Sequence, residues 1–312
     1  MNLLNFSSTF PDEESCKIKW EEFRDKQGVF CPHCGSQEHY WKSDKAVYEC
    51  KQCKYRQSLK ANTVMHGSQL PFRYWFISIH LLTSTKKSFS ASELQRQLGH
   101  RTYNPIWAML HKLRQVMGMR DGCYQLEGVI ELDEGFFLTE TEDSEKDKPL
   151  KRGRGSQKKS RVLVMVESTP VEGELSPNGK PRKVNHIKML VIEDLKAATI
   201  DKRVKKMINK QGTIDSDSST SYNNFKKLVQ EHRPKVIPKN EAAKALPWVH
   251  IAISNAKRML LDIFHDIKPE YLQNYLNEFC YKFNRRYFGE KCFDRLMIAA
   301  VAYKNPFRYN IE

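Results

Sequence analysis

The chain has 312 residues, and its 52 Lys and Arg against 37 Asp and Glu give a formal net charge of +15. This length predicts about two domains, and so large a positive charge favours a polyanionic partner such as DNA, RNA or an acidic membrane surface. The longest apolar run covers only residues 296–303, whereas a membrane-spanning helix needs about 20 apolar residues. The first residues carry no basic leader and no apolar signal segment. We therefore expect an intracellular protein, neither membrane-spanning nor secreted.

Four of the eight cysteines form two close pairs near the N-terminus. Cys31 and Cys34 enclose two residues, Cys50 and Cys53 do the same, and fifteen residues separate the pairs. This spacing is typical of a zinc ribbon, in which two tight turns bring four thiolates together around Zn²⁺. Four thiolates leave no open coordination position, so the zinc is expected to be structural. The alternative is four reduced cysteines without a metal.

Three helices are predicted after the ribbon, between residues 63 and 125. Pro71 is placed like the first residue of one helix. Ser90 and Glu93 form a capping box for the second, which Gly99 ends, and Pro105 begins the third. The break at Gly99 resembles a helix-turn-helix that binds DNA. A plain helical bundle is the alternative.

From residue 128 the pattern changes to strands. We expect strands at residues 129–137, 161–167, 186–192 and 213–217, with a possible fifth at 236–237. We expect helices at residues 200–210, 222–228, 251–264, 270–286 and 293–302. Three successive strands predict an antiparallel meander, and the later alternation predicts parallel crossovers. This α/β order of elements resembles the ribonuclease H-like fold. We therefore divide the chain into a zinc ribbon (1–62), a helical DNA-binding region (63–125) and a catalytic domain with C-terminal helices (126–312).

A basic segment at residues 145–159 interrupts the predicted sheet. Its lysines and arginines surround Gly153 and Gly155. The segment is interpreted as an arm that grasps DNA phosphates, although a solvated loop is compatible with the same sequence. The residues expected to contact DNA are Lys151, Arg152, Arg154, Lys158 and Lys159.

Acidic residues lie on the predicted first and fourth strands. If Ile130 and Leu132 face a core, Asp133 faces the other way. Asp215 and Asp217 share one face of the fourth strand because they are two residues apart. Should the two strands be neighbours, Asp133 would lie beside one of these two aspartates. Adjacent carboxylates repel each other unless they hold divalent cations, and two such cations clamp the attacking and leaving oxygens of a phosphodiester.

Several stretches together resemble bacterial insertion-sequence transposases of the DDE superfamily, in the zinc-ribbon branch with an Asp-Asp-Asn triad (ISXO-type). The resemblance covers nearly the whole length. The stretches that carry it are Cys31-Pro-His-Cys34-Gly, Glu131-Leu-Asp-Glu, Asp217 with Tyr222, His250-Ile-Ala-Ile-Ser-Asn255-Ala-Lys257 and Tyr275-Leu-Asn-Glu278-Phe-Cys-Tyr-Lys-Phe-Asn-Arg285-Arg286.

The resemblance implies a catalytic Mg²⁺ or Mn²⁺ site formed by Asp133, Asp217 and Asn255. It selects Asp217 over Asp215 because Tyr222 follows five residues later. An Asn oxygen can ligate Mg²⁺ without adding charge; the alternative third ligands are Glu278 and Glu241.

Basic residues near the C-terminal end extend the expected DNA contacts. The superfamily often carries a basic residue a turn or two beyond the third ligand, but Asn255 plus seven is Asp262. The residues considered for phosphate binding are Lys257, Arg258, Arg285 and Arg286, of which the last two could instead cap the end of a helix.

The expected function is a DNA transposase that cuts the ends of its element and joins the freed 3′-OH to target DNA. Two ends must be brought together, so a homodimer or larger assembly is implied, on double-stranded DNA in the bacterial nucleoid and cytoplasm. The alternatives are a ribonuclease H-like nuclease without strand transfer and a zinc-ribbon DNA-binding regulator without catalytic activity.

Overall fold

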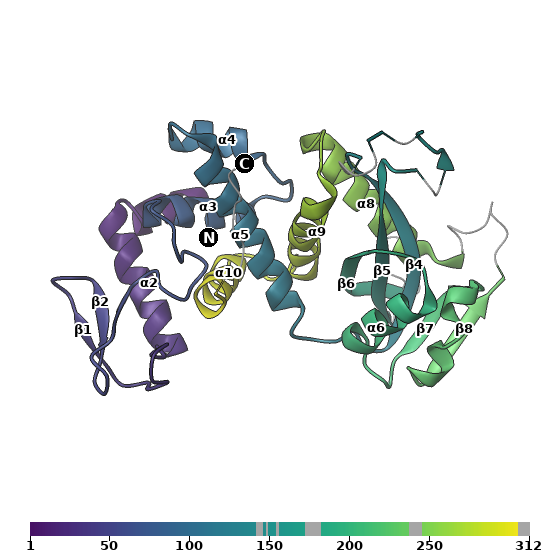
Figure 1. Cartoon of the computed structure of the whole chain (residues 1–312), viewed down its shortest axis with the longest axis horizontal. Coiled ribbons are helices and arrows are strands. Elements are labelled where there is room, and N and C mark those ends of the chain that lie inside the picture. Colours follow the sequence, from purple (N-terminus) through teal and green to yellow (C-terminus); the bar gives the residue numbers. More distant parts are fainter. Residues whose placement is uncertain (142–145, 148, 154–155, 172–181, 237–244, 305–312) are drawn as a thin grey trace. The chain divides into compact units, whose positions relative to one another are not determined.

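The computed structural model describes residues 1–141, 146–147, 149–153, 156–171, 182–236 and 245–304 (Figure 1). These form two compact units. One comprises Met1–Arg120 with the described part of Arg285–Glu312, and the other is Asp121–Asn284. Among the described residues, no helix combines the length and the apolar character needed to cross a membrane.

The first unit begins with two helices that the sequence analysis did not predict, α1 (Leu3–Thr9) and α2 (Glu13–Gln27). Asp12 and Ser15 form a capping box at the start of α2. The Glu13 carboxylate accepts hydrogen bonds from the backbone N–H groups of Phe72 and Arg73 at 2.8 and 2.9 Å. These groups begin α3 (Phe72–Ser84), so the N-terminal helices are fixed to the predicted helical region.

The three predicted helices are confirmed as α3, α4 (Ala91–Leu98) and α5 (Tyr103–Asp121). Ser90 caps α4 by accepting a hydrogen bond from the backbone of Glu93. Gly99 ends the helix with φ +61°, in the left-handed region that glycine adopts at little cost. Helix α5 begins at Tyr103, two residues before Pro105.

The last described helix, α10 (Lys291–Ala302), belongs to the first unit. The sequence interpretation had grouped it with the catalytic domain. The reason for the difference is an aromatic cluster: the Phe293 ring lies 5.8–6.2 Å from the rings of Phe6, Phe10 and Phe76. The backbone N–H of Val64 also donates to the carbonyl of Ala300 at 2.9 Å.

Three short strands follow α2: β1 (His39–Lys42), β2 (Val47–Cys50) and β3 (Arg56–Ser58). They form one antiparallel sheet in that order. The indole N–H of Trp20 and the guanidinium of Arg24, both buried in α2, donate to the carbonyl of Leu59 just after β3. Helix α2 thereby supports the ribbon.

The second unit contains a five-stranded sheet (Figure 1). Its strands are β4 (Val129–Leu138), β5 (Lys159–Pro170), β6 (Arg182–Ile192), β7 (Thr213–Asp217) and β8 (Glu231–Lys235). Their order is β6-β5-β4-β7-β8; the first three are antiparallel, and β7 and β8 run parallel to β4. This is the arrangement of the ribonuclease H-like fold, as predicted.

The fifth strand differs from the prediction, which placed it at residues 236–237. Strand β8 instead ends at Lys235, and residue 237 lies outside the described residues. The segment Glu231–Lys235 has no large apolar side chain and includes Pro234, so it lacks the usual strand pattern. An edge position tolerates a proline because only one side of the strand needs hydrogen bonds.

Helices cover both faces of the sheet. One face packs against α6 (Ala197–Met207) and the short 3₁₀ helices η3 (Thr220–Tyr222) and η4 (Phe225–Lys227). The other packs against α8 (Pro247–Ile263) and α9 (Pro269–Asn284). Since side chains alternate along a strand, Ile130 and Leu132 join the α6 core while Phe137 joins the α8 core. Asp133 therefore faces the α8 side.

Candidate catalytic and zinc sites

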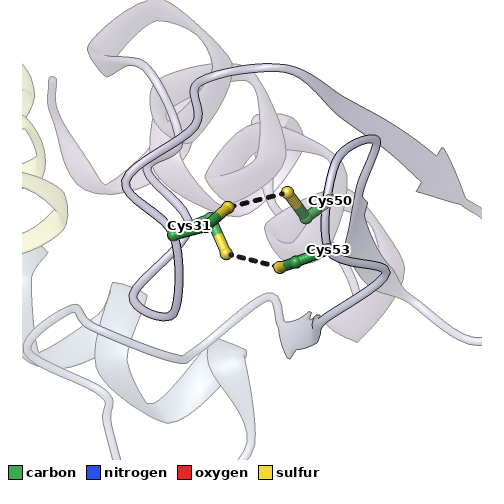
Figure 2. Close-up of side chains that lie close together, drawn as sticks. Cys31, Cys50 and Cys53 are labelled. Atoms are coloured by element: carbon green, nitrogen blue, oxygen red, sulfur yellow. Dashed lines mark hydrogen bonds between the residues drawn. The ribbon is translucent and has the colours of Figure 1, made fainter.

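The four predicted zinc ligands come together at one end of the ribbon. The Sγ atoms of Cys31 and Cys53 lie 3.5 Å apart, as do those of Cys34 and Cys50, and all four lie within 4.8 Å of one another. A tetrahedral zinc with Zn–S bonds of about 2.3 Å requires S···S separations of about 3.8 Å. Figure 2 shows Cys31 from the first turn facing Cys50 and Cys53 from the second. The donor set fits one structural Zn²⁺.

Two similar turns hold these cysteines. In the first, Gly35 has φ +76° and its N–H donates to the carbonyl of Cys31. In the second, Lys54 has φ +61° and its N–H donates to the carbonyl of Cys50. Hydrogen bonding from the backbone of Cys53 lowers the pKa of the Cys50 thiol to about 6, which favours the thiolate that zinc binds.

The two predicted aspartates occupy matching positions on neighbouring strands. Parallel pairing aligns Glu131 on β4 with Asp215 on β7. Two residues further along each strand lie Asp133 and Asp217, on the same face as the aligned pair. Both are partly exposed. The structure thus brings together the two aspartates that the sequence analysis paired.

The aligned pair Glu131 and Asp215 has structural partners. Asp215 Oδ2 lies 3.2 Å from Lys235 Nζ on β8, which neutralises this aspartate. Glu131 is buried, and its Oε2 accepts hydrogen bonds from the backbone N–H groups of Trp248 and Val249 at 2.8 and 3.0 Å. Burial raises the pKa of Glu131, and these two N–H groups oppose the rise. Glu131 therefore caps the beginning of α8, a role that the sequence analysis missed.

Helix α8 lies along β4 from this cap onward. An added Cβ at Gly135 would lie 3.4 Å from Cγ1 of Ile253, so the glycine permits the close approach of the helix. One helical turn later, Lys257 Nζ lies 5.6 Å from the centre of the Phe137 ring. The order of these contacts shows that α8 runs in the same direction as β4.

His250 follows the capped residue Val249 on α8. Its side chain lies beside Asp133. The distance from His250 Nε2 to Asp133 Oδ2 is 3.7 Å. Asn255, which the resemblance selects as third ligand, lies on the same helix and is exposed. Five residues correspond to about 500°, which leaves Asn255 about 140° around the helix axis from His250. The structure brings His250 to Asp133 and turns Asn255 to another side of α8.

Of the two alternative third ligands, the structure describes Glu278. Glu278 is fully buried in α9, where its Oε1 lies 3.0 Å from Lys282 Nζ. This ion pair balances the charge of the buried carboxylate, so the position of Glu278 is explained without a metal. Glu241 lies outside the described residues.

A buried tyrosine adjoins the aspartates from the other face of the sheet. The Tyr222 side chain is fully buried, and its hydroxyl lies within hydrogen-bonding reach of the Glu134 side chain. Burial, then the charge of Glu134 and a side-chain hydrogen bond to it, and then the charges of Asp133 and Asp217 raise the pKa of Tyr222 above its ordinary value. Glu134 therefore lies near Tyr222, and the phenol lies close to the carboxylates.

The basic residues predicted to contact DNA differ in how far their side chains are exposed. Burial, and then the charge of Lys159 at the beginning of β5, lower the pKa of Lys257. Arg285 is only 7% exposed, so the phosphate-binding role expected for it does not fit. Arg286 stacks on the exposed Tyr287 ring at 4.4 Å. The exposed basic side chains are Lys151, Arg152, Lys158 and Arg258; Arg154 lies outside the described residues.

Family models match both the sheet unit and the ribbon. The ISXO2-like transposase domain matches residues 125–284, and the transposase zinc-ribbon domain matches residues 11–56. The chain belongs to the ISXO2-like transposase family. The predicted zinc ribbon is thereby confirmed together with its four cysteines.

Comparison with solved structures finds transposases at low similarity, and comparison with curated proteins finds no significant match. The Mos1 transposase paired-end complex with left transposon end shares 11% identity over 77% of this chain and 82% of that chain, with a TM-score of 0.30. The Mos1 mariner paired end complex with Mn shares 12% identity over 77% and 82%, with a TM-score of 0.29. At these scores the superpositions carry no argument, and the family assignment rests on the sequence models.

The donors beside Asp133 suit a divalent cation. Two carboxylates on one sheet face repel each other when both are ionised, and a cation between them relieves the repulsion. The residues of this transposase therefore fit the metal site that its family implies.

Proposed function

We propose that the protein is a metal-dependent DNA transposase that cuts the ends of its element and transfers the freed 3′-OH to target DNA. The observation that carries the proposal is the placement of Asp133 and Asp217 on adjoining parallel strands, facing α8, within the matched transposase domain. Asp215 cannot take the place of Asp217 without losing its ion pair to Lys235.

Asp133 and Asp217 would hold Mg²⁺ or Mn²⁺ through their carboxylate oxygens. The cation supplies a Lewis acid that stabilises charge on the scissile phosphate and lowers the pKa of water. The backbone N–H of Glu134 donates to Asp133 Oδ1 at 2.8 Å, and that of Ser219 donates to Asp217 Oδ1 at 3.0 Å. These bonds orient each carboxylate through one of its oxygens, and the other oxygen would bind the cation. The same carboxylates serve both cutting and joining, since each is an in-line displacement at phosphorus.

Positive side chains beside the carboxylates would position the DNA backbone. Lys257 lies on α8 next to β4, and Lys159 adjoins it at the start of β5. Two ammonium groups that already repel each other gain from a phosphate placed between them. The exposed lysines and arginines of residues 151–158 extend this positive surface.

Recognition of the element's ends is assigned to the first unit, which contains the ribbon and helices α3 to α5. The ribbon exposes Tyr40, whose ring centre lies 5.3–5.8 Å from the ammonium groups of Lys42, Lys51 and Lys54. An exposed aromatic ring among lysines is suited to a nucleic-acid backbone. Helices α4 and α5 meet at the Gly99 turn in the order of a helix-turn-helix. Pairing of two ends requires at least two protomers on one DNA complex.

A strand-transfer assay with paired element ends tests this function. Full-length zinc-loaded protein is mixed with duplexes from the DNA that flanks the gene and with a supercoiled target plasmid, in Mg²⁺ or Mn²⁺. We expect 3′-end cutting followed by covalent joining of the ends to the plasmid. Cutting without joined products would favour a hydrolytic nuclease. Tight binding of the ends without cutting in either metal would favour a regulator.

A further inference from the structure

We propose that exposed lysines of α6 and η4 bind the backbone of a second DNA duplex, which is the element end that another protomer cuts. This inference rests on the proposed function, because it concerns a complex that holds two ends. The lysines lie in the second unit, and we call them the α6 surface. Its members are the exposed residues Lys202, Lys205, Lys206, Lys210, Lys226 and Lys227.

Helix α6 has an apolar side and a basic side. Ile200 and Val204 are fully buried against the sheet. At 100° per residue, Lys202, Lys205 and Lys206 lie within an arc of about 100° on the opposite side of the helix. The three lysines therefore form one stripe, directed away from the sheet.

The short helix η4 adds two lysines beside this stripe. The side-chain amide of Asn224, just before η4, donates to Asp201 Oδ2 on α6 at 2.8 Å. Phe225 of η4 packs into the core beneath α6. Lys226 and Lys227 belong to the same helix and are exposed. The acidic residue of α6 is thus engaged by η4, and the lysines of both helices belong to one surface.

The lysines of the α6 surface lack acidic partners. In the part of the chain that the structure describes, none of the six forms an ion pair, whereas the neighbouring Lys196 lies 3.3 Å from Asp194. Lys202 precedes Lys206 by four residues, and like charges at this spacing destabilise a helix. The stripe therefore costs stability until a polyanion lies against it.

A charged helix face that meets only water usually carries both signs. Helix α2 is an example, because Lys17 lies 3.2 Å from Glu14 and Lys19 lies 2.8 Å from Glu22. The helix dipole favours cations in the last turn of α6. It accounts neither for the lysine in the middle of that helix nor for the two on η4, so a solvated face does not explain the whole surface.

The chemistry of the α6 surface suits the backbone of double-stranded DNA. Helix α6 has 11 residues and is about 16 Å long, a length over which a duplex presents about nine phosphate charges. Proteins that bind single strands stack bases on exposed aromatic rings, whereas Tyr222 and Phe225 beside these lysines are fully buried. Lysines that contact phosphate carry no sequence information, so the surface holds a duplex without reading it.

The position of the surface does not suit the duplex that the same protomer cuts. Asp133 lies beside α8, and α6 packs on the other face of the sheet. The sheet therefore separates the lysines from the aspartates. Target DNA must also reach the aspartates when an end is joined to it. The remaining duplex of a paired complex is the end that another protomer cuts, and its backbone is the ligand that we assign to the α6 surface.

Energy transfer between two labelled end duplexes tests the assignment. A donor-labelled and an acceptor-labelled duplex from the DNA that flanks the gene are mixed with zinc-loaded full-length protein, without Mg²⁺ or Mn²⁺. The α6 variant combines Lys202→Gln, Lys205→Gln and Lys206→Gln, which keep good helix formers on α6. We expect wild-type affinity for a single end, and pairing of two ends weakened by at least about tenfold. The plot of log pairing affinity against log salt should lose about 0.9 of slope for each lysine that contacts phosphate.

The matched control combines Lys17→Gln, Lys19→Gln and Lys26→Gln, which remove the same charge from the mixed face of α2. It should pair ends as the wild type does. Normal pairing in the α6 variant overturns the inference, as does an equal loss in the control. Weakened self-association of the α6 variant without DNA, measured by analytical ultracentrifugation, would show that the lysines contact protein and would overturn it as well.

The same assay separates this inference from the proposed function. If the wild type pairs ends and cuts them in neither Mg²⁺ nor Mn²⁺, the transposase activity fails, while loss of pairing in the α6 variant still supports the surface. If the wild type cuts and joins ends and the α6 variant pairs them normally, the function stands and the α6 surface alone is wrong. Normal pairing with poor joining to the plasmid would assign the lysines to target DNA and overturn the assignment to a second end.

Discussion

Replacement of Glu131 should release the beginning of α8 from β4. Its Oε2 accepts two backbone hydrogen bonds, from Trp248 and Val249. Hydrogen bonds to a charged acceptor contribute about 1.5–3 kcal/mol each. Burial of the carboxylate offsets part of this gain, and the same burial raises its pKa. We expect a net loss of about 2 kcal/mol in Glu131→Ala, within the usual cost of losing an N-cap.

Hydrogen exchange of the first turn of α8 measures this loss locally. Since about 1.4 kcal/mol corresponds to a factor of ten, the amides of Trp248 and Val249 should exchange about 30-fold faster in Glu131→Ala. Glu131→Gln keeps an acceptor oxygen and should show a smaller acceleration. Glu127→Ala, at an exposed glutamate before β4, is the matched control and should change nothing in α8. Wild-type exchange in Glu131→Ala would refute the cap.

Three further predictions follow from the same structure. Gly135→Ala should lower the thermal midpoint by a few degrees, since the new Cβ would lie 2.9 Å from the Phe137 ring and overpacking costs about 1–3 kcal/mol; an unchanged midpoint in calorimetry would contradict the crowding of Gly135 by Phe137. The protein should contain one zinc per chain by elemental analysis, and Cys34→Ser should lose zinc and end-specific binding while the far-UV circular dichroism of the sheet unit persists; full zinc content in that variant would contradict the four-cysteine site. Neutralising the basic segment should flatten the plot of log DNA affinity against log salt, because each lost phosphate contact reduces the slope by about 0.9; an unchanged slope would show that the segment does not touch phosphate. The residues to neutralise together are Lys151, Arg152, Lys158 and Lys159.

The central sheet could be predicted from the sequence because its strands are buried. Strand β7 has the predicted bounds, 213–217, and β4 differs from its prediction by one residue. Apolar side chains on these strands meet helices on both faces, which leaves a continuous pattern to recognise. The zinc ribbon was equally readable because the ligand spacing reflects the geometry of two tight turns.

The missed elements depend on distant partners. Helix α2 has a largely polar sequence in which Cys16, Trp20 and Arg24 are the buried residues. Its position is fixed by contacts with Leu59 and with the beginning of α3. Of the three buried residues only Cys16 and Trp20 are apolar, which is too few to mark an apolar face in the sequence.

The side chain of α8 that meets Asp133 could not be read from the sequence for a similar reason. Whether His250 or Asn255 faces Asp133 depends on how α8 is rotated against β4. Glu131 determines that rotation through bonds to residues 117 and 118 positions away.

The most direct test of the account is cleavage of an element end by three aspartate variants. Asp133→Asn, Asp217→Asn and Asp215→Asn are compared with the wild type on one end-labelled duplex in Mn²⁺, after zinc content and DNA affinity are shown to be normal. The account predicts no detectable cutting by the first two variants and clear cutting by Asp215→Asn, because Asp215 is occupied by Lys235. Wild-type cutting by either Asp133→Asn or Asp217→Asn would contradict the claim that these two aspartates hold the catalytic metal.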